Sequence, residues 1–176
     1  PKITHVTAIA SGGNLTNYGV NNYINALPTM TNVTTIASGN GSINVSIFNY
    51  NNSLPTITNV TATALEGNTN IAIFNYNSSP IITNTKVIAL VSVSYGINNE
   101  NFSSTTIYNS SLRGVTSSIY NHSDSTAKII NSILDGNIEI GDGMTCNYVS
   151  NIDNDLLDTS CDTASANQIL QSDENG

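Results

Sequence analysis

Residues 55–64 read PTITNVTATA, and close relatives of this stretch recur along the chain. They begin at Pro1, Pro28 and Pro80, so the start-to-start spacings are 27, 27 and 25 residues. Weaker copies begin at Thr105 and, 22 residues later, at Ala127. Repetition at such a period predicts a solenoid, in which each repeat forms one coil that stacks on its neighbours.

One Asn in each repeat sets the alignment of the coils. Its column comprises Asn32, Asn59, Asn84, Asn109 and Asn131, with His5 in the first coil. Two residues earlier, every coil has an apolar residue: Ile3, Met30, Ile57, Ile82, Ile107 and Ile129. After the Asn, small or apolar residues alternate with polar ones, as in Val60, Ala62 and Ala64. Alternation with a period of two predicts a β-strand that buries one face.

A bend is predicted at the Asn itself. Ile57 and Val60 are both expected to point inward, although they are three residues apart, so the chain must turn near Asn59. Asn tolerates turns, and stacked Asn amides can hydrogen-bond from coil to coil. We therefore predict that this Asn column is a buried internal ladder.

A second half-coil follows turns rich in Gly, Ser and Asn, such as residues 37–42 (ASGNGS). It contains an apolar column of Val20, Ile47, Ile73, Ile97 and Ile119. It also contains a second predicted Asn ladder of Asn22, Asn49, Asn75, Asn99 and Asn121. Its aromatic columns are Tyr23, Tyr50 and Tyr76, and Phe48, Phe74 and Tyr120. We expect these rings to pack on one another, with sugar stacking by the tyrosines as the alternative.

Coils of 22–27 residues with short strands, no crossover helices and Asn at the bends resemble the right-handed parallel β-helix of the pectate-lyase-like superfamily. The expected fold class is therefore all-β, a β-helix of about six coils over residues 1–145. Residues 131–161, NSILDGNIEIGDGMTCNYVSNIDNDLLDTSC, also resemble the C-terminal end of secreted bacterial repeat proteins of this kind. That resemblance implies a cap over residues 146–163, followed by a polar tail over residues 164–176. Enzymes, phage tailspikes and adhesins share this fold, so the resemblance does not determine an activity.

Two cysteines occur, Cys146 and Cys161, and both lie beside turn-forming residues near the C-terminus. An even pair that closes a short loop predicts a disulfide and an oxidising environment. The expected location is therefore extracellular or at the cell surface. A loop of about fifteen residues would gain about 3 kcal/mol from this bridge in the chain-entropy model.

Charge and hydropathy argue against two classes of partner. Four Lys and Arg residues against twelve Asp and Glu residues give a net charge of −8, which repels nucleic acid and anionic lipid. No apolar run approaches the roughly 20 residues that span a bilayer, so we expect no membrane insertion. The sequence begins directly on a repeat without a signal segment, which favours a mature chain or a piece of a longer one.

Catalytic signatures are missing from the sequence. The NTD, DD, GHG and RIK motifs of polygalacturonase-like enzymes do not occur. Ten of the twelve acidic residues lie at or beyond Asp124, which leaves only Glu66 and Glu100 for the first four coils. A calcium-dependent lyase needs clustered carboxylates. We therefore expect no catalytic residue and no cofactor, with a polysaccharide lyase or hydrolase as an alternative.

Individual charged residues have simpler interpretations. His5 and His122 lie in different columns, where each is expected to substitute for an Asn or a Tyr. Arg113 and Asp135 each lie four residues after a column Asn, so they should face outward on adjacent coils and form an ion pair. The spacing of Asp153, Asp155 and Asp158 fits neither an EF-hand loop nor a nonapeptide calcium repeat. We therefore predict a solvated acidic cap and no metal site.

The outward positions carry the functional prediction. Before the bend they include Thr29, Thr31, Thr56 and Thr58; after it they include Thr7, Thr34, Thr61 and Thr63. These columns form flat and nearly uncharged faces. We predict a non-catalytic extracellular structural or adhesive module that presents them to glycans or to other chains.

Two further partners follow from the same faces. Outward Ile9, Ile36 and Ile88 favour self-association, either lateral or end to end. Threonine columns about 4.8 Å apart can order water, and T-x-T strands resemble those of ice-binding solenoids. Lys2, Ile81, Lys86 and Lys128 interrupt the columns, so ice binding is the alternative function.

Overall fold

The structure, a computed structural model, is a parallel β-solenoid of about five turns. It describes residues 1–122, 124–136, 138–140 and 144–151. No helix occurs among these residues. Each complete coil contains three strands, and all strand pairs between coils are parallel and in register. The predicted all-β solenoid is thus confirmed, with a sixth coil that is only partial.

The strands occupy three positions in each coil. The first position is occupied by β1 (Lys2–Thr4), β4 (Thr29–Thr31), β7 (Thr56–Thr58), β10 (Ile81–Thr83) and β13 (Ser104–Tyr108). The second is occupied by β2 (Thr7–Ser11), β5 (Thr34–Ser38), β8 (Thr61–Leu65), β11 (Lys86–Ala89) and β14 (Ser111–Gly114). The third is occupied by β3 (Thr16–Tyr23), β6 (Ile43–Tyr50), β9 (Thr69–Tyr76), β12 (Val93–Glu100) and β15 (Ser117–Asn121). The partial coil contains β16 (Thr126–Asp135), β17 (Ile138–Ile140) and β18 (Met144–Asn151).

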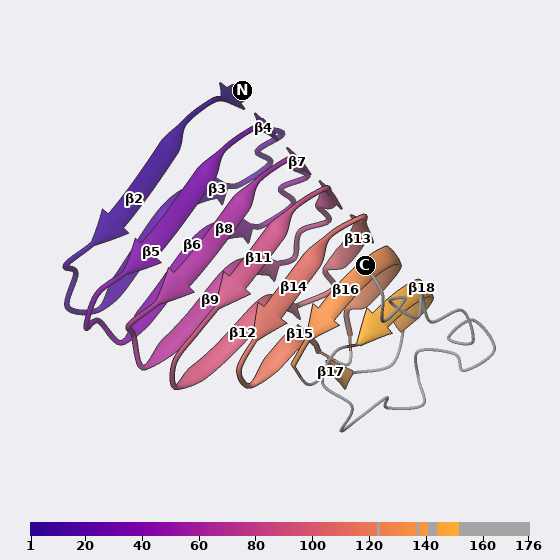
Figure 1. Cartoon of the computed structure of the whole chain (residues 1–176). Helices are drawn as coiled ribbons and strands as arrows, with labels where there is room; N and C mark the ends of the chain where they lie inside the picture. Colours follow the sequence, from indigo (N-terminus) through magenta and orange to yellow (C-terminus); the bar gives the residue numbers. More distant parts are fainter. Residues whose placement is uncertain (123, 137, 141–143, 152–176) are drawn as a thin grey trace, which may run out of the picture.

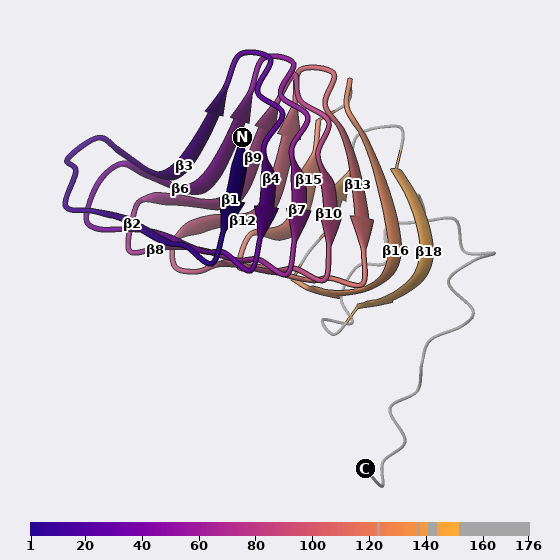
Figure 2. The same cartoon turned by 90° about the horizontal axis from the view of Figure 1, so that it is seen from above.

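Two sheets enclose the core. The five strands of the third position form a six-stranded sheet with β17, while the ten strands of the first and second positions form one twelve-stranded sheet with β16 and β18. These two positions join because β16 runs through the corner without a break and pairs with both β13 and β14. Figure 1 shows the coils stacked along the solenoid, and Figure 2 shows the three strand positions on three sides of it.

The core consists of the apolar columns that the repeat predicted. Met30, Ile57, Ile82, Ile107 and Ile129 are fully buried, as are Ile47, Ile73, Ile97 and Ile119 from the opposite sheet. Their counterparts in the first coil, Ile3 and Val20, are only partly buried and pack against the same cluster. Each coil therefore adds one layer of large side chains. The side chains of a layer are fully buried only when it has a neighbouring coil on both sides.

Small residues line the narrow corner between the second and third strand positions. A side chain at Gly96 would collide with the Ser118 carbonyl oxygen, and one at Gly114 with the Ser117 carbonyl oxygen. The same corner contains Ala37, Ala64 and Ala89 in earlier coils, all fully buried. Close approach of the two backbones therefore requires Gly at positions 96 and 114, whereas the earlier coils leave room for the methyl group of Ala.

The predicted burial of the first Asn column is wrong. Asn59 Nδ2 donates to Asn32 Oδ1 at 3.2 Å, and Asn131 Nδ2 donates to Asn109 Oδ1 at 2.7 Å, so the column does form a ladder. However, its members are solvent-exposed: Asn32, Asn59, Asn84, Asn109 and Asn131. All five have a left-handed backbone, with φ between 47° and 54°. This conformation turns the chain so that the Asn points outward between two inward neighbours, and Asn adopts it at lower cost than most residues.

The second Asn column is the buried ladder. Asn22, Asn49, Asn75, Asn99 and Asn121 are at most 5% exposed. Each Nδ2 donates to the Oδ1 of the next coil, at distances of 2.8, 2.7, 2.8 and 3.2 Å. The last amide, of Asn121, donates to the Ser125 carbonyl oxygen at 2.6 Å. The ladder prediction is confirmed for this column.

A third ladder was not predicted. Asn17, Asn44 and Asn70 are buried and are each the second residue of β3, β6 or β9, next to the turn that precedes the strand. Asn17 Nδ2 donates to Asn44 Oδ1 at 2.7 Å, and Asn44 Nδ2 donates to the Leu65 carbonyl oxygen at 2.7 Å. These amides hold the turn backbone as well as each other. Their spacings of 27 and 26 residues were a readable signal in the sequence.

Only some of the C-terminal predictions concern residues that the structure describes. β18 crosses the predicted boundary at residue 145 and pairs in parallel with β16. Most of the predicted cap (146–163) and the whole tail (164–176) lie outside the described residues, as do Asp153, Asp155 and Asp158. Cys161 also lies outside them, so the Cys146–Cys161 disulfide stays a prediction.

Replacing Asn75 with Leu should destabilise the fold by about 1–3 kcal/mol. Asn75 accepts a hydrogen bond from Asn49 and donates to Asn99 and to Thr105, so its loss leaves buried polar atoms without partners. Urea denaturation followed by circular dichroism measures the change in the free energy of unfolding.

The exposed column provides the matched control. Asn59→Gly should change the free energy of unfolding by no more than about 0.5 kcal/mol, because Gly accepts a positive φ. Asn59→Ala should cost about 1–2 kcal/mol through backbone strain. Equal losses for Asn75→Leu and Asn59→Gly would contradict the assignment of one ladder to the core and the other to the surface.

Candidate functional site

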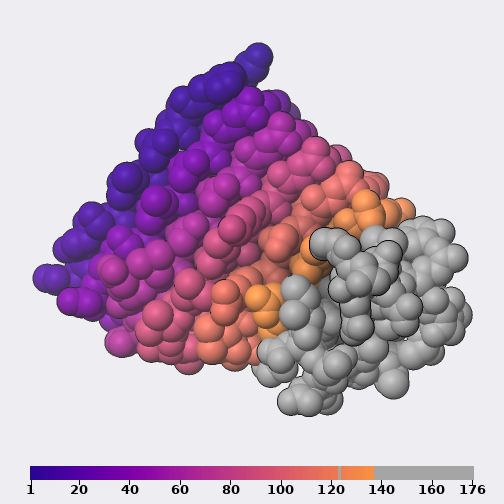
Figure 3. Space-filling model, viewed as in Figure 1, coloured from indigo at the N-terminus to yellow at the C-terminus, as the bar shows by residue number. Residues whose placement is uncertain are grey.

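Threonine faces occupy the outer side of the twelve-stranded sheet. Thr29 and Thr56 are exposed and pair in register, as do the half-buried Thr31 and Thr58. Past the corner, Thr7, Thr34, Thr61 and Thr63 also point outward, in alternation with buried residues. Figure 3 shows the coils as parallel rows on the side formed by β2, β5, β8, β11 and β14. The outward positions of all eight predicted threonines are confirmed.

The exposed Asn column connects the two threonine faces. In coil two, Thr31, Asn32 and Thr34 follow one another around the corner, and in coil three Thr58, Asn59 and Thr61 do the same. We call this set of six residues the corner band. It presents hydroxyl, amide and hydroxyl groups in the same order on adjacent coils, which sequence reasoning missed because it placed the Asn inside.

The apolar outward residues differ from the prediction in their exposure. Ile9 is 65% exposed, whereas Ile36 and Ile88 are half-buried between neighbouring coils. Ile81, on the first strand position, is 48% exposed. Stacking thus covers most of the side-chain area that a single strand would leave open.

Aromatic columns line the outer side of the six-stranded sheet. Tyr23, Tyr50 and Tyr76 stack with ring centroids 5.1 and 5.3 Å apart and interplanar angles of 9° and 20°. Phe48 and Phe74 stack beside them at 5.1 Å. A sugar can stack only on a ring face that is open to solvent, whereas these rings stack face to face on one another. The geometry therefore favours packing over sugar binding.

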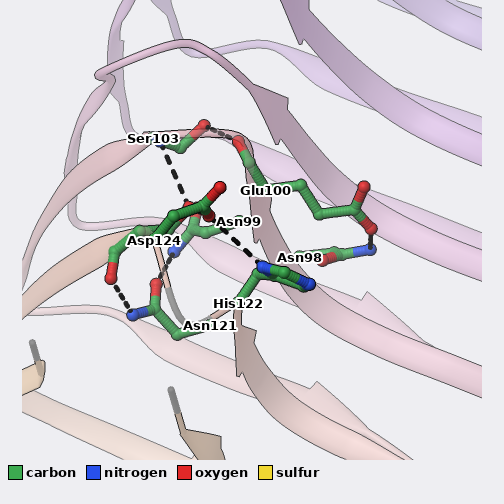
Figure 4. Close-up of polar contacts among 8 residues, drawn as sticks. Asn98, Asn99, Glu100, Ser103, Asn121, His122 and Asp124 are labelled. Atoms are coloured by element: carbon green, nitrogen blue, oxygen red, sulfur yellow. Dashed lines mark hydrogen bonds and ion pairs between the residues drawn. The ribbon is translucent and has the colours of Figure 1, made fainter. Parts of the chain in front are cut away.

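A polar cluster interrupts the aromatic columns (Figure 4). Glu100 takes the position of Tyr76 on the next coil, and Asn98 takes that of Phe74. Asn98 Nδ2 donates to Glu100 Oε1 at 3.0 Å. One coil further, His122 Nδ1 lies 3.3 Å from Asp124 Oδ1. Asn98 and Glu100 were not singled out from the sequence, because one departure from a column resembles ordinary drift.

Asp124 has an altered acidity in this cluster. Partial burial would raise the pKa of its carboxyl group, but hydrogen bonds from the Phe102 backbone N–H, the Ser125 hydroxyl and His122 outweigh that effect. The net result is a pKa below the ordinary value of aspartate. The carboxylate is therefore ionised at neutral pH and links the loop after β12 to the next coil.

The remaining charged candidates are found in pairs. Arg113 Nε lies 3.3 Å from Asp135 Oδ2, and their strands are in register at these residues, which confirms the predicted pair. Asn32 Nδ2 lies 3.1 Å from His5 Nε2 in the exposed ladder, as expected for a substitute. Among the described residues, no group of three or more His, Cys, Asp or Glu side chains is arranged to hold a metal ion.

The described part of the chain contains no helix with the length and apolar character needed to cross a membrane.

The Arg113–Asp135 pair should contribute no more than about 1 kcal/mol, because both side chains are open to water. A double-mutant cycle with Arg113→Ala and Asp135→Ala measures the coupling energy, which should shrink as salt screens the charges. A coupling energy that does not change with salt would argue against an ion pair at the surface.

Acid should weaken the contact between Asp124 and Phe102. Because the folded pKa lies below the unfolded one, the stabilisation is fully present above the unfolded value of about 3.9 and is lost as pH falls through the folded pKa. Hydrogen exchange at the Phe102 amide, corrected for its intrinsic rate, should therefore rise over this range. In Asp124→Asn the same amide should lack this step, and an identical step there would contradict the assignment.

Comparison with known proteins gives no relative. No protein-family model matches the chain, and no curated protein or solved structure is significantly similar to it. The fold assignment therefore rests on the strand register, and membership of the pectate-lyase-like superfamily is not shown.

Proposed function

We propose that this chain is a non-catalytic structural or adhesive module of the cell exterior that binds glycans or other chains through its threonine faces. The observation that carries the proposal is the corner band, in which the same hydroxyl and amide groups recur on adjacent coils. A repeated row of donors and acceptors suits a repeated ligand, since each coil can bind an equivalent group of the ligand. A glycan with free hydroxyls is such a ligand.

Rigidity supports the same function. The buried Asn22–Asn121 ladder and in-register strands connect every complete coil to the next, and the other two Asn columns add hydrogen bonds between some of the coils. The side chains on the surface are thus fixed by the backbone before any ligand arrives, which lowers the entropic cost of binding. The predicted Cys146–Cys161 disulfide favours an extracellular or cell-surface location.

Self-association is a second means of adhesion. Ile9 and Ile81 are exposed on the threonine faces, and lateral contact between two solenoids would bury them. End-to-end contact would instead extend the strand register from one copy to the next. Ordered filaments or dimers in solution would support self-association.

Ice binding remains the alternative function, and the T-x-T strands β4 and β7 favour it. Lys2, Ile81 and Lys128 interrupt the outer column of the first strand position, which leaves only a short threonine row. A polysaccharide lyase or hydrolase is the third candidate. Arg113, the arginine that a lyase would use as a base, is paired with Asp135.

Removing hydroxyl groups from the corner band should weaken glycan binding. The double variant Thr31→Val and Thr58→Val keeps the side-chain shape but loses two hydrogen-bonding groups. We expect the Kd of a glycan selected by array screening to rise about tenfold. Thr69→Val, on β9 of the other sheet, is the matched control and should leave the Kd unchanged.

Other outcomes would overturn the proposal. Thermal hysteresis without glycan binding or assembly would favour the ice-binding alternative. Release of unsaturated or reducing sugars, lost in Arg113→Ala, would favour the enzyme. An equal effect of Thr69→Val would show that the corner band is not the binding surface.

A further inference from the structure

A polar notch interrupts the aromatic columns at coils four and five. The column of Tyr50 and Tyr76 continues with Glu100, and then with His122. Asn99 and Asn121 are register partners, so Glu100 and His122 follow on neighbouring strands. Such strands are about 4.8 Å apart, which places the two side chains next to each other on the outer side of the sheet.

Asn98 lies beside this pair with an unused acceptor. The residue is only 5% exposed, and its Nδ2 donates to Glu100 Oε1 at 3.0 Å, which fixes the orientation of the amide. Its Oδ1 is buried and has no hydrogen-bond partner, one of two such side-chain atoms in the described part of the chain. Leaving a buried acceptor unpaired costs free energy, and a hydrogen bond donated by a ligand would remove this cost.

His122 contributes a second acceptor. Its Nδ1 lies 3.3 Å from Asp124 Oδ1, so in the neutral ring the proton belongs on Nδ1, where it is donated to the carboxylate. The lone pair then lies on Nε2. The His122 side chain is 51% exposed, and no hydrogen bond uses this nitrogen in the described part of the chain. The second carboxylate oxygen of Glu100 is a further acceptor in the same cluster.

We propose that Asn98, Glu100 and His122 form a binding site for a primary ammonium group. An ammonium group offers three donors and no acceptor, which matches an amide oxygen, a carboxylate oxygen and an imidazole nitrogen. Its charge complements Glu100 and the nearby Asp124, and Tyr76 and Tyr120 are the register neighbours of Glu100 and Asn98. The ammonium could belong to an amino sugar or to a lysine side chain.

Two other ligand classes fit less well. The described residues contain no group of three or more His, Cys, Asp or Glu side chains arranged for a metal ion, which argues against a divalent cation. A neutral hydroxyl brings an acceptor together with its donor and leaves the carboxylate charge uncompensated. The site lies on the sheet opposite the corner band, so the inference does not depend on the proposed function.

Titration with small amines tests the site. Methylammonium should bind saturably and shift the NMR signals of the Asn98 side-chain amide, whereas tetramethylammonium, which has no N–H donor, should not. Glucosamine should bind more tightly than N-acetylglucosamine, whose nitrogen is uncharged. Tighter binding of glucosamine than of Nα-acetyl-lysine amide would identify an amino sugar as the source of the ammonium, and the reverse order would identify lysine.

Two variants test the residues themselves. Glu100→Gln removes the charge and should weaken methylammonium binding at least about tenfold. Glu66→Gln removes one equal charge from the exposed turn after β8 and should leave the affinity unchanged. Asn98→Leu removes the buried acceptor without changing the charge, and should weaken binding as well.

Several results would overturn the proposal. They are the absence of saturable binding, equal affinity for tetramethylammonium and methylammonium, equal affinity for glucosamine and N-acetylglucosamine, and equal losses in Glu100→Gln and Glu66→Gln. The last of these would show attraction by net charge alone. Circular dichroism of each variant confirms that a loss of binding is not a loss of fold.

Discussion

The structure depends on hydrogen bonds between identical side chains on neighbouring coils. An Asn amide buried in the core must find a donor and an acceptor there, and in the second column each amide finds both in the Asn one coil away. This arrangement works only if the coils are aligned to the residue, since a shift by one position would bury the amides without partners. The repeat in the sequence is thus the direct result of satisfying buried polar groups. The ladder ends at Asn121 on a backbone carbonyl oxygen, where no further Asn is needed.

The two main Asn columns show that one residue type can recur for different reasons. Asn59 lies at a corner with φ of 53° and is exposed, whereas Asn75 lies in a strand and is fully buried. At the corner, Asn is favoured because its backbone tolerates the left-handed region; in the strand, it is favoured because its amide pairs with copies of itself. The amides also point in opposite directions. Corner amides donate to the preceding coil, while core amides donate to the following one.

Much of the fold could be predicted because each inward position is repeated in five or six coils. The apolar columns, the second Asn ladder and the Arg113–Asp135 pair all follow from counting residues within a coil. The burial of Asn59 was predicted wrongly, although Ile57 and Val60, both inward, already implied that the two residues between them point out. Asn98 and Glu100 could not be recognised in the same way, since each occurs once. They can be recognised as departures from aromatic columns only when the strand register shows which residues occupy the same positions on the neighbouring coils.

The position of unrepeated residues is therefore the most informative feature for function. Ladders and apolar layers use nearly every polar group inside the solenoid, and the two buried side-chain atoms without partners among the described residues, Thr4 Oγ1 and Asn98 Oδ1, belong to columns of the outer faces. Chemistry is left to the outer faces, where uniform columns such as the corner band suit a ligand with repeating groups. A single polar substitution in an aromatic column instead suits one small group at one place.

Replacing a ring by Asn98 gives up ring stacking and leaves a buried acceptor, a cost that stability alone does not explain. Binding of a donor at that position would offset the cost, which is why the notch at Asn98 and Glu100 carries more functional information than the regular coils around it.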